Sequence, residues 1–150
     1  MKTVTSPVKR FPGTVGLKDP LPLDACILWE AAIQDCNPKT CPTGREILLP
    51  FFALDKDDER RAEIVTAYNQ HFYACVESEN IPRCKPGKTE IQAQARLLPA
   101  VKACVEAWGI EGFDLSNPPG SPKAARSELI GWIIGEVNKL YLGEEPDPNA

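Results

Sequence analysis

Apolar side chains recur at three- and four-residue steps along residues 121–143, close to the end of the chain. This spacing predicts an amphipathic helix with one broad apolar face. The face comprises Leu129, Ile130, Trp132, Ile133, Ile134, Val137, Leu140 and Tyr141. Ser121 is expected to cap the first turn, Pro122 to occupy the first helical position, and Gly143 to end the helix in a left-handed turn. The segment offers apolar surface and no reactive group, which favours association over catalysis.

The same periodicity predicts three further helices. The first covers about residues 23–35 and ends before Asn37-Pro38, because proline cannot continue the hydrogen-bond ladder. The second covers about residues 55–78 and begins with a cluster of acidic side chains, which the helix dipole favours. The third follows Thr89 and Gln92, which have the spacing of a capping box, and ends at Gly109. Pro99 is expected to kink or split it.

The remaining segments carry weaker patterns. Residues 11–17 are β-prone but broken by proline and glycine, so we expect them to run extended over the body without forming a sheet. Residues 37–50 are expected to form a loop, and residues 144–150 are acidic, proline-rich and expected to be disordered. The predicted fold is therefore all-α. It is a single domain of four to five helices over residues 23–143, with an extended N-terminal arm over 1–22 and a flexible tail over 144–150.

Composition narrows the function classes. The chain has 150 residues, a formal net charge of -4 and a pI of about 5.1, which argues against a broad phosphate-binding surface and a nucleic-acid partner. No apolar run approaches the roughly 20 residues that span a bilayer, so no membrane partner is expected. No secretory signal follows Met1, and we expect a cytoplasmic protein.

Two glycines interrupt the interior of the last predicted helix. Gly131 and Gly135 lie four residues apart, and each costs about 1 kcal/mol relative to alanine. We expect close packing against another element of the same domain to offset this cost, and self-association through the same seam is the alternative.

Six cysteines and one histidine are the residues with the most potential chemistry. No disulfide framework is expected in a reducing compartment. Cys26, Cys75 and Cys104 fall within helical patterns and are interpreted as small apolar residues, whereas Cys36, Cys41 and Cys84 lie in connections rich in proline and glycine.

Zinc is the alternative interpretation of these groups. Cys36-x4-Cys41, together with His71-x3-Cys75 or Cys75-x8-Cys84, would supply four ligands. The gaps are looser than the usual two to four residues, so unpaired thiols are the favoured interpretation. Whether Cys36, Cys41, His71, Cys75 and Cys84 bind zinc stays open.

No pattern in the chain predicts an active site. There is no Gly-x-Ser-x-Gly elbow beside the single histidine, His71, and no glycine-rich phosphate loop. Paired carboxylates occur only where solvent is expected. We therefore expect no catalytic residue and no cofactor.

Several stretches resemble the tail assembly chaperones of long-tailed bacteriophages, which come from the siphophage tail gene cluster and precede the tape-measure protein. They are Phe-Pro-Gly-Thr-Val-Gly-Leu-Lys-Asp-Pro-Leu-Pro-Leu at 11–23, Leu-Trp-Glu at 28–30, and Leu-Leu-Pro-Ala-Val at 97–101 leading to Trp-Gly-Ile-Glu-Gly at 108–112. Residues 121–141 also show the likeness, with Gly-Glu-Glu at 143–145 and Pro-Asn at 148–149. The middle of the chain, Cys36 to Lys88, departs from the family pattern.

The resemblance implies a non-enzymatic helical protein in the cytoplasm of the infected bacterial host. Such a protein would bind the tape-measure protein and recruit tail-tube subunits, and no catalytic residues come with it. The expected partner contacts are Trp108, Trp132, Ile133 and Tyr141, and a homo-oligomer is left open. The alternatives are a structural virion protein, such as a head–tail connector, and a zinc-stabilised helical interaction module.

Overall fold

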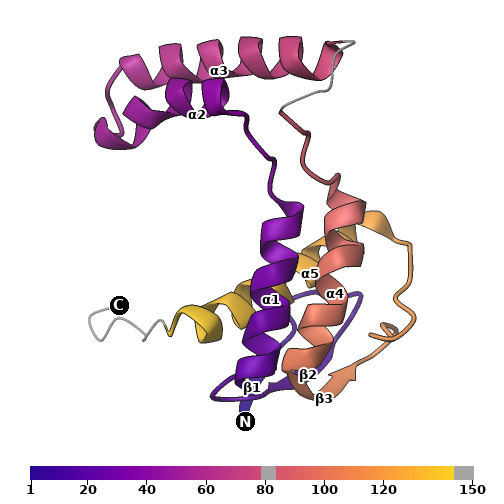
Figure 1. The fold of residues 1–150 in the computed structure, drawn as a ribbon. Coiled ribbons are helices and arrows are strands. Elements are labelled where there is room, and N and C mark those ends of the chain that lie inside the picture. Colours follow the sequence, from indigo (N-terminus) through magenta and orange to yellow (C-terminus); the bar gives the residue numbers. More distant parts are fainter. Residues whose placement is uncertain (79–83, 144–150) are drawn as a thin grey trace. The chain divides into compact units, whose positions relative to one another are not determined.

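The computed structural model describes residues 1–78 and 84–143, and its chain forms two compact units (Figure 1). Unit 1 comprises Met1–Cys36 and Thr89–Ala150, and unit 2 comprises Asn37–Lys88. Unit 2 is therefore inserted in sequence between two parts of unit 1. The predicted domain over residues 23–143 includes parts of both units, and the predicted tail, 144–150, lies outside the described residues.

Unit 1 contains a three-stranded antiparallel sheet in the order β1-β2-β3. The strands are β1 (Lys2–Thr5), β2 (Gly13–Leu17) and β3 (Val105–Ile110). Val15 in the central strand lies opposite Val4 on one side and Trp108 on the other. The sheet thus joins the start of the chain to a segment about 90 residues later in sequence.

Three helices complete unit 1. Helices α1 (Leu23–Cys36) and α4 (Glu90–Cys104) lie side by side, and α5 (Lys123–Leu142) also packs on α4 (Figure 1). Trp29 of α1, Val101 of α4 and Val137 of α5 are each fully buried. All the buried residues of the main hydrophobic core belong to unit 1.

The all-α prediction is wrong, because the structure is mixed α and β. The expected N-terminal arm, residues 1–22, contains β1 and β2, and the third predicted helix ends at Cys104 rather than at Gly109. Short strands are stable only when they are paired. Each of these segments is too short to show its pairing in its own sequence, and β2 pairs with β3 across about 90 residues of the chain.

Details of the predicted helix ends are partly confirmed. The capping box of Thr89 and Gln92 is present at α4, and Gly143 ends α5 with a left-handed backbone (φ 68°). Ser121 is not the cap of α5, since Pro122 holds that position without a side-chain hydrogen bond. Pro99 lies inside a continuous α4, which it does not split.

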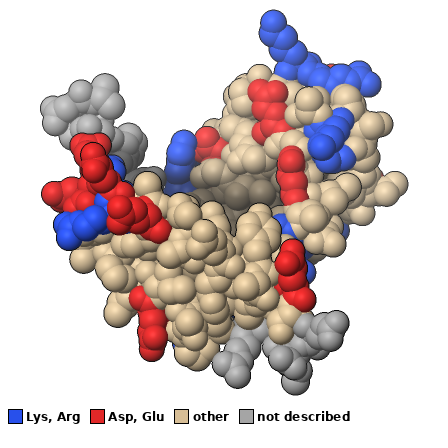
Figure 2. All heavy atoms as spheres, turned by 90° about the horizontal axis from the view of Figure 1, so that it is seen from above, with Lys and Arg blue, Asp and Glu red and all other residues tan. Residues whose placement is uncertain are grey.

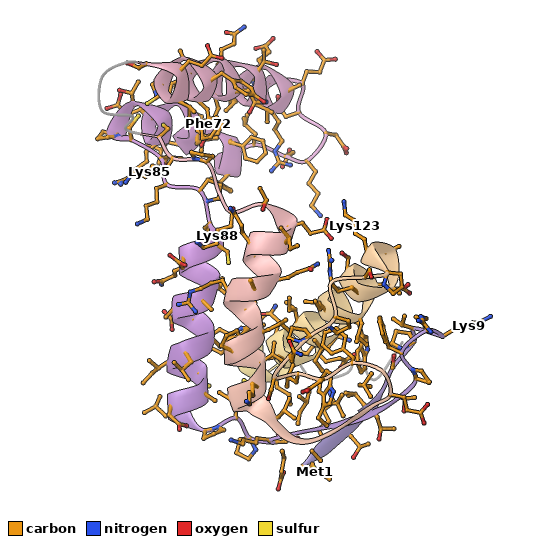
Figure 3. The ribbon with its side chains drawn as sticks, turned by 90° about the vertical axis from the view of Figure 1, so that its right-hand side faces the viewer. Met1, Lys9, Phe72, Lys85, Lys88 and Lys123 are labelled. Atoms are coloured by element: carbon orange, nitrogen blue, oxygen red, sulfur yellow. The ribbon has the colours of Figure 1, made fainter. Side chains whose placement is uncertain are left out.

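Unit 2 consists of α2 (Pro42–Leu48), the 3-10 helix η1 (Leu49–Ala53) and α3 (Arg60–Glu77). The expected loop over residues 37–50 therefore contains a helix, and the second predicted helix begins at Arg60 rather than at Asp55. Helices α2 and α3 pack together, and Phe72 lies on the side of α3 that faces α2 (Figure 3). Lys39 and Lys85 form an antiparallel bridge that ties the two ends of the unit.

None of the helices in residues 1–78 and 84–143 combines the length and the apolar content that a membrane span needs.

Candidate metal centre

Four side chains converge in unit 2: Cys41, His71, Cys75 and Cys84. Cys41 immediately precedes α2, His71 and Cys75 lie on α3, and Cys84 lies on the segment that returns towards Lys88. The histidine and Cys75 are four residues apart, which places both on one helix face. The ligand atoms of all four residues lie within 4.8 Å of one another.

The distances between these ligand atoms suit a metal ion with tetrahedral coordination. Cys41 Sγ lies 3.0 Å from His71 Nε2 and 3.4 Å from Cys84 Sγ. Sulfur atoms bound to one zinc ion at about 2.3 Å lie about 3.8 Å apart. The four groups therefore need only small side-chain adjustments to surround a single ion.

Backbone amides already support the sulfur atoms. The N–H of Gly44 donates to Cys41 Sγ at 3.4 Å, the N–H of Cys41 donates to Cys84 Sγ at 3.4 Å, and the N–H of Cys84 donates to Cys75 Sγ at 3.1 Å. Such donors stabilise negative charge on the ligand atoms and fix their orientation. All three thiols of the centre thus have an outer hydrogen bond from the chain itself.

The electrostatics of the thiols differ. The backbone N–H of Gly44, followed by the His71 side chain, lowers the pKa of Cys41 from 9.0 to about 6. Burial raises the pKa of Cys84. Burial is also the main reason why the pKa of Tyr68 is raised, and the nearby Cys84 and Cys41 add to it. A bound dication favours the thiolate form of every sulfur ligand. Cys41 is thus the thiol whose deprotonated form, the form that binds metal, is already favoured by its protein surroundings.

Cys36 does not belong to the centre. It ends α1 in unit 1, whereas the four converging residues all belong to unit 2. Of the spacings noted in the sequence, His71-x3-Cys75 and Cys75-x8-Cys84 contribute completely, and Cys36-x4-Cys41 contributes only Cys41. The i, i+4 pair of His71 and Cys75 on α3 is the most local of these signals, because two ligands on one helix face need no knowledge of the fold.

Three cysteine sulfurs and one imidazole would form a closed ligand set. Structural zinc sites use four protein ligands, whereas catalytic zinc sites keep a position for water or substrate. The converging group contains no carboxylate that could act as a general base. The arrangement is therefore suited to holding structure together rather than to activating water.

The residues expected to contact partners are placed differently. Ile133 is 1% exposed and lies in the core of unit 1, so it is not available as a surface contact. Trp108, Trp132 and Tyr141 are half-buried against that core. Trp108 Nε1 donates to the carbonyl of Phe113 at 2.7 Å, and the Tyr141 hydroxyl donates to Glu30 at 3.1 Å. These side chains serve mainly the packing of unit 1.

Charged side chains form no continuous stripe of one sign on the face shown in Figure 2. Lysine and arginine are interspersed there with acidic and uncharged residues.

Compared with known proteins, the chain matches no family model, no curated protein and no solved structure. The candidate centre is therefore interpreted from its own geometry and chemistry.

Proposed function

We propose that unit 2 is a structural zinc module, bound by Cys41, His71, Cys75 and Cys84, in a protein that works by binding other chains rather than by catalysis. The observation that carries this proposal is the convergence of the four ligand atoms within 4.8 Å. Two ligands come from α3 and the other two from segments on either side of it, so one ion would tie together the whole unit.

The packing of unit 2 supports a need for metal. Among its described residues, only Cys41, Gly44 and Cys84 are buried, and no residue of α3 or η1 is buried. A unit of roughly 50 residues has a marginal apolar core, which disulfides or a metal often supplement. Its most buried side chains are ligands of the centre, so the ion would take the place of the missing core.

The ligand types favour zinc. Thiolate-rich sites select zinc, copper(I) and iron–sulfur clusters, and three sulfurs with one imidazole in a tetrahedron match a structural zinc set. The purified chain is expected to contain one zinc per molecule by elemental analysis. Substitution by Co²⁺ is expected to give the absorption bands of a tetrahedral thiolate site.

Metal removal should unfold unit 2 alone. All three tryptophans lie in unit 1. Chelation is therefore expected to reduce the helical circular dichroism while leaving the tryptophan emission unchanged, because binding energy at such sites is folding energy. Retention of full helicity by the zinc-free chain would overturn the structural role.

A matched pair of variants distinguishes the proposed zinc ligands from cysteines outside the centre. Cys84→Ser is expected to weaken zinc binding by more than about a hundredfold, since even the loss of outer-shell partners costs about 10–100-fold. Cys36→Ser, which changes a cysteine outside the centre, is expected to keep one zinc per chain. Equal zinc loss in both variants would contradict the assignment of ligands.

A second candidate function is favoured by where the resemblance falls. The stretches that resemble tail assembly chaperones all belong to unit 1, and the departing segment, Cys36 to Lys88, almost coincides with unit 2. We propose that unit 1 is a tail assembly chaperone domain that binds the tape-measure protein and recruits tail-tube subunits in the bacterial host cytoplasm. The zinc module would then be an insertion in that domain.

Co-expression with the neighbouring tail genes tests this second candidate. The chain is expected to co-purify with a tape-measure fragment and to be missing from purified virions by mass spectrometry. Its presence in finished particles would instead favour a structural component such as a head–tail connector. Failure to recover any tape-measure fragment would contradict the chaperone role.

A further inference from the structure

Helix α1 shows apolar side chains on both of its faces. Ala25, Trp29 and Ala32 are buried on the side that packs into unit 1. On the other side Leu23, Ile27 and Leu28 are 76%, 59% and 51% exposed. Three large apolar side chains exposed within six residues of one rigid helix form a surface that calls for an explanation.

The exposed residues form an ordered stripe. Leu23, Ile27 and Ala31 are spaced four apart, so they follow one another along the helix surface. Leu28 lies to one side of them. Because the opposite face is buried around Trp29, the orientation of this stripe is fixed by the fold and needs no ordering on binding.

Acidic side chains border the stripe on both sides. At 100° per residue, Glu30 falls at one margin and Asp24 with Asp35 at the other. Helix α1 carries no lysine or arginine. Asp35 forms an ion pair with Arg96 at 3.0 Å. Glu30 accepts hydrogen bonds from the side chains of Tyr141 and Gln34, which are neutral and therefore do not offset its negative charge.

We infer that this acid-bordered stripe, Leu23, Ile27 and Ala31 between Asp24 and Glu30, is a docking surface for an amphipathic helix whose own apolar stripe is flanked by lysine or arginine. Apolar side chains spaced three and four apart supply affinity in helix pairing, and complementary charges at the margins set partner choice. A second copy of α1 is a poor occupant, because antiparallel pairing would bring the acidic margins together. The surface lies in unit 1 and uses no residue of the metal centre.

A labelled synthetic helix tests this inference on the full, zinc-loaded chain. The probe is a peptide of about 18 residues with leucine at stripe positions and lysine at both margins, compared with the same peptide carrying glutamate instead of lysine. Fluorescence anisotropy is expected to show that the lysine peptide binds at least about tenfold more tightly, with affinity falling as salt rises from about 50 to about 300 mM.

Variants of the chain locate the binding surface. Leu23→Gln with Ile27→Gln should weaken binding of the lysine peptide by about tenfold or more, and Asp24→Asn with Glu30→Gln should reduce its salt dependence. Phe52→Gln removes an apolar side chain of unit 2 that is 80% exposed and should leave binding unchanged. Circular dichroism confirms that each variant is folded.

Three results would overturn the inference. They are equal binding of the lysine and glutamate peptides, equal weakening by Phe52→Gln, and a homodimer in sedimentation that Leu23→Gln with Ile27→Gln abolishes. The last would make a second copy the occupant. Zinc content is measured separately, so loss of the metal proposal and loss of this one are distinguishable.

Discussion

At the residue scale, cysteine plays opposite parts in the two units. Cys41 precedes α2, accepts the Gly44 N–H and contacts His71, and its pKa falls to about 6. Cys104 lies in the core of unit 1, where burial, followed by the nearby Cys26, raises its pKa to about 11. The same side chain is therefore a proposed metal ligand in one place and a small apolar residue in the other.

The raised pKa of Cys104 predicts a loss of stability in alkali. The folded state favours the neutral thiol, so this contribution is complete below the unfolded pKa of 9.0 and is lost as pH rises towards about 11. The urea concentration at which unit 1 is half unfolded, monitored by tryptophan emission, should therefore decrease as the pH is raised from 9.0 to about 11. Cys104→Ala should show a smaller fall, although its midpoint at pH 7 is lower because a cavity remains. An identical alkaline fall in both proteins would exclude Cys104 as its source.

At the element scale, the two glycines of α5 lack the close packing that the sequence analysis predicted for them. Gly131 and Gly135 are exposed, and a Cβ atom added at either meets no atom within 4 Å. The close packing expected within the domain is therefore wrong. A four-residue glycine spacing shows that close approach is sterically allowed, but it does not show that a neighbour is there.

Alanine at these two positions should stabilise unit 1. Each substitution removes the helix cost of glycine, about 1 kcal/mol, without a clash. Gly131→Ala with Gly135→Ala should therefore raise the free energy of unfolding by about 2 kcal/mol in urea titrations. Gly13→Ala is the opposing control, since its φ is +133° and a Cβ there would clash with the carbonyl oxygen of Gly109. Destabilisation by the α5 pair would show that this face is covered in solution, as a self-association seam would require.

At the scale of the whole molecule, unit 2 is an insertion. The residues of the main core all come from unit 1, where α1 and α4 pack directly on each other, and Asp35 near the end of α1 pairs with Arg96 of α4. The antiparallel bridge between Lys39 and Lys85 closes the base of unit 2.

Deletion of unit 2 should therefore leave unit 1 folded. A chain in which about six glycine and serine residues replace 37–88 is expected to unfold cooperatively and to keep the emission of the buried Trp29. It should bind no zinc, because all four proposed ligands are removed. A red-shifted emission, or loss of cooperative unfolding, would show that unit 1 depends on unit 2.

Local patterns were sufficient for elements whose signals are local. The first predicted helix matches α1 within one residue, the capping box of Thr89 and Gln92 is present, and Gly143 ends α5. Apolar periodicity and helix caps act over a few residues, so they can be read without knowledge of the fold. The end of α4 could not be read in this way, because Val105 leaves the helix to pair with β2.

By itself, the sequence determined the main helices, the acidic balance and the pool of candidate ligands. Only the tertiary structure decided that residues near the start of the chain pair with Val105–Ile110, that Cys36 is left out, and that Cys41 and Cys84 meet His71 and Cys75. The physical reason is the range of the interactions. Helices form from contacts within one or two turns. By contrast, β2 pairs with a strand about 90 residues later in the chain, and Cys41 meets His71 and Cys84 across 30 and 43 residues.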